Sequence, residues 1–141
     1  MIRNILIPAI KEAFPDLPFS FSPSSNPVAR LQPSFGEIGT LDIYDDGGEV
    51  TVDITEVTHG HFSSYDVSLS EEQHNHRIVE DVIGFLRALF ADHVLLFRTP
   101  GRGNRGVGGW YRLDVSPKPA TFPSDREYFL WSGPYDTHKF A

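Results

Sequence analysis

The fold is decided by one stretch in the middle of the chain, residues 37–57, which reads EIGTLDIYDDGGEVTVDITEV. Apolar and polar side chains alternate on both sides of the Asp45–Gly48 segment, as in strands with one buried and one wet face. An Asp-Gly pair between two such runs is typical of a tight hairpin turn. We therefore predict a β-hairpin with strands over 37–44 and 49–57, followed by a third strand over 59–67.

Two helices are predicted outside this hairpin. Residues 2–14 place apolar side chains at helical spacing, and Pro8, which suits only the first turn of a helix, predicts a late start or a break. The Ser-Glu-Glu-Gln capping box at 70–73 precedes a broad apolar stripe, which predicts a long helix over about 70–91. Gly84 lies inside that helix, where we expect it to let the helix approach the sheet closely.

The remaining segments complete a single domain over residues 1–141. Residues 15–35 are rich in proline and serine and predict an extended connector that packs on the body of the domain. Strands are expected over 94–97 and 110–115, and one short strand or docked segment in the Pro-rich C-terminal segment 117–141. This order predicts an α+β fold, a mostly antiparallel sheet with both helices on one face.

Composition excludes several classes of protein. The chain is 40% apolar and 13% aromatic over 141 residues, so it can bury a core in one domain. No apolar run approaches the roughly 20 residues of a membrane span and no secretory signal is recognisable, so we expect a cytoplasmic protein with no membrane partner. The absence of cysteine excludes disulfides and thiolate catalysis. Residues 101–106 match G-x-G-x-x-G, but no helical pattern follows, so no dinucleotide site is expected.

The net charge of −7 is unevenly distributed along the chain. Residues 37–81 hold twelve acids against one base, whereas residues 93–141 hold seven bases against four acids. An acidic field repels nucleic acid and attracts basic partners. We therefore predict a non-enzymatic binding protein whose acidic sheet face, represented by Asp42, Asp53 and Glu56, engages a basic protein partner. The alternative is that the charge only keeps the domain soluble.

The histidines lead to a second hypothesis, a small metal-dependent enzyme or sensor. His59 and His61 point the same way if they lie on a strand, as paired imidazoles must to reach one metal. Together with Asp66 they would form a metal-ion site, and no other cofactor is expected. The alternative is that these histidines only make hydrogen bonds at strand ends. A second pair, His74 and His76, diverges on a helix and is poorly placed to chelate.

The third hypothesis is an anion or nucleic-acid site in the Arg/Gly loop, residues 98–112. Arg102 and Arg105 lie among glycines whose amides can approach a phosphate, and arginine forks bind phosphate or carboxylate. The alternatives are arginines that face solvent or pair with acids. Trp110 is a further candidate binding residue because aromatic residues and arginine dominate binding hot spots. Aromatic residues in strands, however, more often belong to the core.

Several segments resemble small bacterial α+β domains of unknown function. They are Asp42–Val52, Thr58–Phe62, the helix Ile78–Phe90 and Gly108–Tyr111. Some domains of this size and acidity are similar to immunity proteins, which accompany secreted polymorphic toxins and neutralise them by direct binding. The resemblance implies an inhibitor of a nuclease-like toxin and transfers no catalytic residue. The Arg/Gly loop departs from what such an inhibitor needs.

Overall fold

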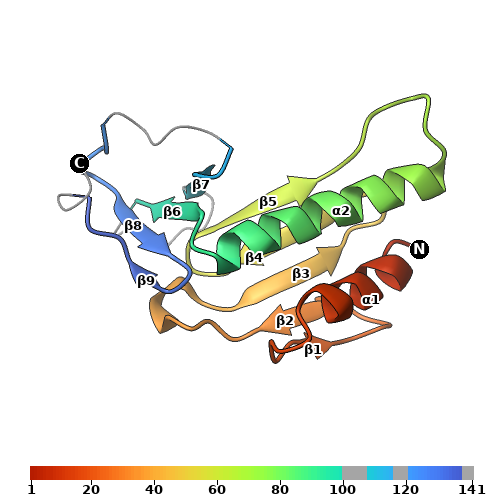
Figure 1. Ribbon diagram of the computed structural model, residues 1–141, viewed down its shortest axis with the longest axis horizontal. Coiled ribbons are helices and arrows are strands. Elements are labelled where there is room, and N and C mark those ends of the chain that lie inside the picture. The colour runs from red at the N-terminus through yellow and green to blue at the C-terminus, as the bar shows by residue number, and fades with distance from the viewer. Residues whose placement is uncertain (100–107, 116–120, 138–141) are drawn as a thin grey trace.

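The computed structural model describes residues 1–99, 108–115 and 121–137 and has an α+β fold. Both helices of this described part lie on one face of a five-stranded antiparallel sheet, and a four-stranded antiparallel sheet closes one end of the molecule (Figure 1). The predicted fold class is confirmed, with the strands divided between two sheets. In chain order the elements are α1 (Arg3–Ala13), β1 (Ser20–Phe21), β2 (Ala29–Leu31), β3 (Leu41–Asp45), β4 (Val50–Ile54), β5 (Thr58–Phe62), α2 (Glu71–Phe90), β6 (Val94–Arg98), β7 (Gly109–Arg112), β8 (Glu127–Leu130) and β9 (Gly133–Pro134).

The predicted hairpin is confirmed as the antiparallel pair β3 and β4. Its buried face consists of alternate apolar side chains, Leu41, Ile43, Val50, Val52 and Ile54. Gly47 has a φ of +83° in the turn, a conformation that a residue with a Cβ rarely adopts. The first strand of the hairpin begins later than predicted, because Gly36–Ile38 forms a single 3-10 turn. The predicted third strand is also shorter, since β5 ends at Phe62.

Helix α2 begins and ends where the sequence predicts. Ser70 Oγ accepts a hydrogen bond from the Gln73 backbone N–H at 3.2 Å, and Gln73 Oε1 accepts from the Ser70 N–H at 2.8 Å. This reciprocal pair is the predicted capping box. The expectation for Gly84 is wrong: it does not lie against the sheet, and a Cβ built there would meet no atom within 4 Å.

Helix α1 runs through Pro8, which neither delays nor breaks it as the sequence predicts. Proline lacks the N–H that would donate to the carbonyl four residues earlier, at Asn4. Since both residues are exposed, water can satisfy that carbonyl. Leu6 and Ile10 are fully buried on the other side of the helix and hold it in place.

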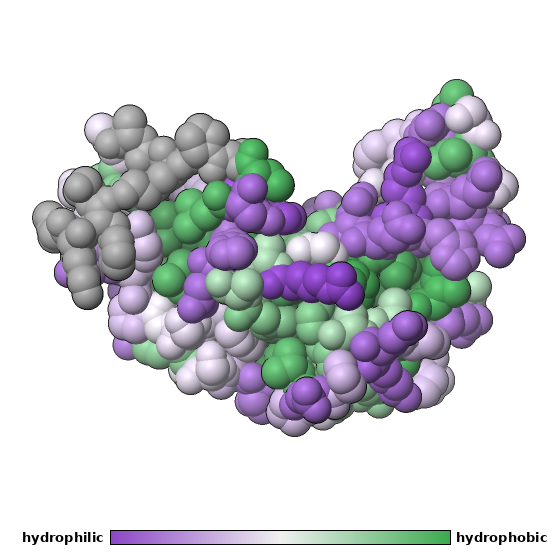
Figure 2. All heavy atoms as spheres, in the orientation of Figure 1, coloured by the Kyte–Doolittle hydropathy of each residue, from purple (hydrophilic) through white to green (hydrophobic). Residues whose placement is uncertain are grey.

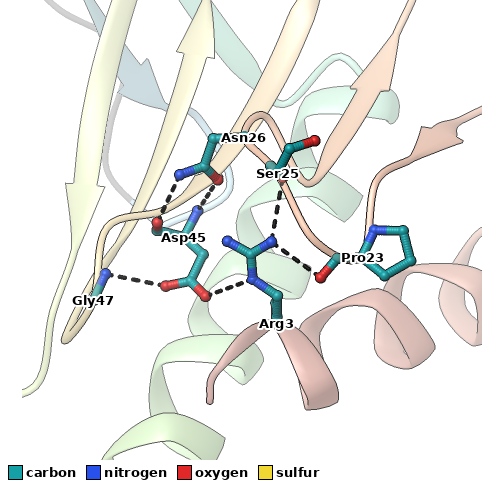
Figure 3. A network of polar contacts seen from close by, with 6 residues as sticks. All are labelled: Arg3, Pro23, Ser25, Asn26, Asp45 and Gly47. Carbon is teal, nitrogen blue, oxygen red and sulfur yellow. Dashed lines mark hydrogen bonds and ion pairs between the residues drawn. The ribbon is translucent and has the colours of Figure 1, made fainter.

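A buried ion pair fastens the start of α1 to the hairpin (Figure 3). Arg3 Nε lies 3.0 Å from Asp45 Oδ2, and the two side chains are 12% and 3% exposed. Arg3 Nη1 also donates to the carbonyls of Pro23 and Ser25, at 3.1 and 3.3 Å. The Asn26 side chain donates from Nδ2 to the Asp45 carbonyl at 2.9 Å and accepts at Oδ1 from the Asp45 N–H at 3.0 Å. The helix, the connector and the hairpin turn are therefore held together at one point.

The Pro- and Ser-rich connector, residues 15–35, contributes to the sheet. Strand β2 pairs antiparallel with β3, and β1 pairs antiparallel with β2 at the edge of the sheet. The ring of Phe19 lies 6.3 Å from that of Phe90 at the end of α2. The expectation that the connector packs on the body is confirmed, and its two short strands are an addition that its composition did not indicate.

The second sheet, in the order β7-β6-β8-β9, shares a core with the first. Val94, Leu96, Phe129 and Trp131 belong to the same buried cluster as the apolar residues of the hairpin. One continuous core across both sheets favours a single domain. Within the described residues, neither helix is long and apolar enough to cross a membrane.

Candidate functional site

The outer face of the five-stranded sheet holds two of the acids predicted to meet a partner. Asp42 and Asp53 lie opposite each other in register, but they are only 2% and 8% exposed. Arg30 donates from Nε and Nη2 to the two oxygens of Asp42, at 2.7 and 2.9 Å. These hydrogen bonds raise the pKa of the Arg30 guanidinium. The expectation that the strand acids face water is therefore wrong for this pair, and neither is placed to meet a partner.

Glu56, the third predicted acid, is exposed in the turn between β4 and β5. Its backbone carbonyl accepts from Arg98 Nη1 at 2.9 Å. Arg98 Nε donates to Glu127 Oε1 at 3.2 Å. The first arginine of the Arg/Gly loop thus ties the β4–β5 turn to β8, so this guanidinium already has partners within the chain.

The last arginine of the loop also has a partner within the chain. Arg112 donates from Nε and Nη2 to the two oxygens of Asp114, at 2.9 and 2.8 Å. These hydrogen bonds lower the pKa of the Asp114 carboxyl. Arg102 and Arg105, the predicted anion-binding residues, lie outside the described residues.

Trp110 packs between the two sheets. A Cβ added to Gly60 of β5 would lie 2.1 Å from Trp110 Cη2, so the indole covers the glycine backbone directly. The Trp110 ring centroid is 4.6 Å from that of Phe85 on α2. These contacts give this candidate binding residue a packing role.

The predicted metal ligands are only partly brought together. His59 and His61 do point the same way from β5, with ring centroids 5.3 Å apart. Asp66 instead accepts hydrogen bonds from the hydroxyl and backbone N–H of Ser68, at 2.6 and 2.9 Å, and lies 3.7 Å from Arg77. The Ser68 hydrogen bonds lower the pKa of Asp66. The structure thus directs Asp66 toward the start of α2.

Two other carboxylates take the position expected for Asp66. One ligand atom from each of Asp46, Glu49 and His61 lies within 4.8 Å of the others, at the tip of the β3–β4 hairpin. His61 Nδ1 is 3.6 Å from Glu49 Oε1 and 2.9 Å from Thr51 Oγ1. The hydroxyl of Thr51 also donates to Asp46. These are the residues of the described chain that could hold a metal ion.

A groove of about 710 Å³ runs between α1 and α2 (Figure 2). Its half-buried and buried lining residues are all apolar, and they form the floor: Ile5, Ala9, Ala13, Val79 and Ile83. Pro8 and Gly84, the two residues least suited to a helix interior, also line it. We call this feature, together with the hollow described next, the α1–α2 groove.

The rim of the α1–α2 groove is acidic. A second hollow of about 340 Å³ shares Asn4, Ile5 and His76 with the first and extends the groove to the start of α2. The exposed carboxylates that line the two hollows are Glu12, Glu71, Glu72 and Glu80. Arg87 is the only arginine or lysine among the lining residues. The surface therefore combines an apolar floor with a negative border.

The apolar stripe of α2 did not reveal this groove, because such a stripe is typical of a helix face that packs on the core. Two signals in the sequence point to it. Pro8 and Gly84 weaken their helices, and residues that break a local rule without structural benefit often mark function. In Figure 2 the apolar surface lies between the two helices, next to hydrophilic surface from the start of α2.

Comparisons of the chain with models of protein families, with curated proteins and with solved structures found no match. The geometry described above is therefore the basis for assigning a function.

Proposed function

We propose that this is a binding protein that captures a basic protein partner in the α1–α2 groove. The observation that carries the proposal is the combination of a floor formed by five apolar residues with a rim that bears four glutamates. Such a surface suits an amphipathic helix whose apolar face fills the groove while its lysines or arginines meet the rim. An immunity-type inhibitor of a toxin is the most specific form of this function.

The dimensions of the groove support a short helical occupant. Helix α1 has 11 residues, which corresponds to a length of about 16 Å, so the groove accommodates about three turns of a partner helix. The two helices run in the same direction, with both N-termini at the end bordered by Glu71 and Glu72 (Figure 1). A partner helix would place its most basic end there.

Charge argues against a second copy of this chain as the occupant. The glutamates of two facing grooves would meet each other, and like charges brought together at an interface disfavour association. The net charge of −7 adds to this repulsion over longer distances. A basic partner avoids both costs and gains a faster, salt-sensitive association rate.

A peptide-binding experiment tests the site directly. The probe is a fluorescein-labelled 14-residue Leu/Lys peptide with an amphipathic helical pattern, compared with a scrambled peptide of equal composition by fluorescence anisotropy. The variant Gly84→Met fills the groove, and methionine is also the better helix former, so folding is retained. We expect at least about a tenfold loss of affinity, equivalent to about 1.4 kcal/mol.

A pair of charge reversals locates the binding surface. Glu80→Lys changes the groove rim, and Glu56→Lys makes the same change at the sheet turn. The proposal predicts weaker binding for the first variant and little change for the second. Equal losses, or equal binding of the scrambled peptide, would contradict it. A lysate protein retained by the parent and lost with Gly84→Met would then be a candidate natural partner.

A further inference from the structure

We propose that Asp46, Glu49 and His61 bind a divalent transition-metal ion at the tip of the β3–β4 hairpin. None of these three residues lines the α1–α2 groove. The site is therefore independent of the proposed partner-binding surface, and the failure of one proposal leaves the other intact.

The three groups lie close enough for a small metal ion to draw them together. Zinc binds imidazole nitrogen and carboxylate oxygen at about 2.0–2.2 Å in tetrahedral geometry, which places its ligand atoms about 3.3–3.6 Å apart. The three ligand atoms here are within 4.8 Å of one another before any ion binds. Asp46 and His61 are exposed, so small rotations of their side chains suffice to close the site.

Two hydroxyl groups orient the ligands from outside. Thr51 donates its single hydroxyl proton to Asp46, so its oxygen accepts a hydrogen bond from His61 Nδ1–H, at 2.9 Å. Ser63 donates to Glu49 Oε2 at 2.8 Å, while Glu49 Oε1 lies on the side of His61. Thr51 is 8% exposed and lies opposite His61 in the β4–β5 register. Partners of this kind restrict the rotation of metal ligands and tune their affinity.

The set of donors selects the class of ion. Imidazole favours zinc, nickel, copper and iron, whereas calcium and magnesium prefer sites made only of oxygen. The ring of His59, 5.3 Å from that of His61, supplies a second imidazole at the same face of β5. A mixed set of carboxylates and imidazole therefore points to Zn²⁺ or Ni²⁺ over Ca²⁺ or Mg²⁺. An ion at His61 Nδ1 would displace its hydrogen bond to Thr51, with the ring proton held on Nε2, while the Thr51 hydroxyl keeps its bond to Asp46.

Calorimetric titration of untagged, chelator-treated protein tests the site. Zn²⁺ and Ni²⁺ are the probes, and Ca²⁺ and Mg²⁺ are the comparison ions. We expect saturable binding of one Zn²⁺ per chain, and at least a tenfold loss of affinity for His61→Ala. Thr51→Val is close in shape and removes the hydroxyl that orients Asp46, so it should weaken binding about tenfold.

The matched control is another histidine that lies near a carboxylate. His76 Nε2 lies 3.9 Å from Glu72 Oε1 on α2, in an exposed pair with no third ligand in the described residues. His76→Ala should leave the affinity for Zn²⁺ unchanged. Zinc-induced changes in backbone amide NMR shifts should be confined to the β3–β4 turn and β5. Equal affinities of the parent and His61→Ala, or equally tight Ca²⁺ binding, would overturn the proposal.

Discussion

Replacing Arg3 by methionine would remove the guanidinium that joins α1 to the hairpin. Its Nε–Oδ2 contact with Asp45 measures 3.0 Å, and the carboxylate is 3% exposed. After the change, Asp45 Oδ1 still accepts from the Gly47 N–H at 3.0 Å, but Oδ2 loses its charged donor. Removing one partner of a buried ion pair costs about 3–5 kcal/mol, because the other charge stays buried without compensation.

We expect the lower end of that range, about 3 kcal/mol. Gly47 continues to stabilise the carboxylate, and the bonds of Arg3 to the carbonyls of Pro23 and Ser25 lie at an exposed position that water can reach. A loss of this size should lower the midpoint of thermal unfolding by roughly 10 °C. It is smaller than the stability of a typical domain, about 5–15 kcal/mol, so the variant should still fold.

Urea unfolding followed by far-UV circular dichroism measures this difference. The control is Arg87→Met, the same substitution at an exposed position on α2, which should cost less than about 1 kcal/mol. The double variant Arg3→Met/Asp45→Asn removes both charges and should recover part of the loss. If Arg3→Met is no more destabilising than Arg87→Met, the reasoning from burial of the ion pair is refuted.

Two further substitutions test other contacts. Gly60→Ala would push its methyl group into Trp110, since the built Cβ lies 2.1 Å from the indole, and should destabilise the domain by about 1–3 kcal/mol; unchanged near-UV circular dichroism and stability would contradict this packing. Ser68→Ala removes the largest cause of the lowered pKa of Asp66, so NMR titration should show that pKa rising toward its ordinary value. A carboxyl whose pKa is lower in the folded state than in the unfolded state stabilises the folded state at pH values above the unfolded-state pKa. The parent should therefore lose the stability contributed by Asp66 as the pH falls through its folded-state pKa, and the variant should lose less.

The hairpin and the long helix could be predicted because their signals are local. The turn at Gly47 needs a positive φ, and the strands beside it alternate with a period of two residues. The start of α2 depends on Ser70 and Gln73, which are three residues apart. Interactions over such short separations are visible in any window of the sequence.

The acids of the sheet show where local sequence patterns are insufficient. Alternation assigns Asp42 and Asp53 to the polar face, but it says nothing about what covers that face. Arg30 reaches Asp42 from β2, a strand inside a connector whose prolines and serines give no strand pattern. The burial of Asp42 therefore depends on the pairing of β2 with β3, which the sequence does not reveal.

The candidate metal site shows the same division. The sequence correctly places His59 and His61 on one side of a strand. Which acid approaches His61 depends on the register of β4 against β5, which sets Thr51 opposite His61 and brings the hairpin tip alongside. Asp66, nearer in the chain, turns away to Ser68 and Arg77.

The sequence by itself determined the α+β class, the hairpin, the capped helix and the excess of negative charge, because periodicity, turn chemistry and composition act over a few residues or over the whole chain. Only the tertiary structure decided which charges are neutralised and which remain at the surface. It also created the α1–α2 groove, since Ile5 and Ile83 are far apart in the chain and meet only when both helices pack on the sheet. Contacts of this kind follow from the packing of whole elements, and no local pattern encodes them.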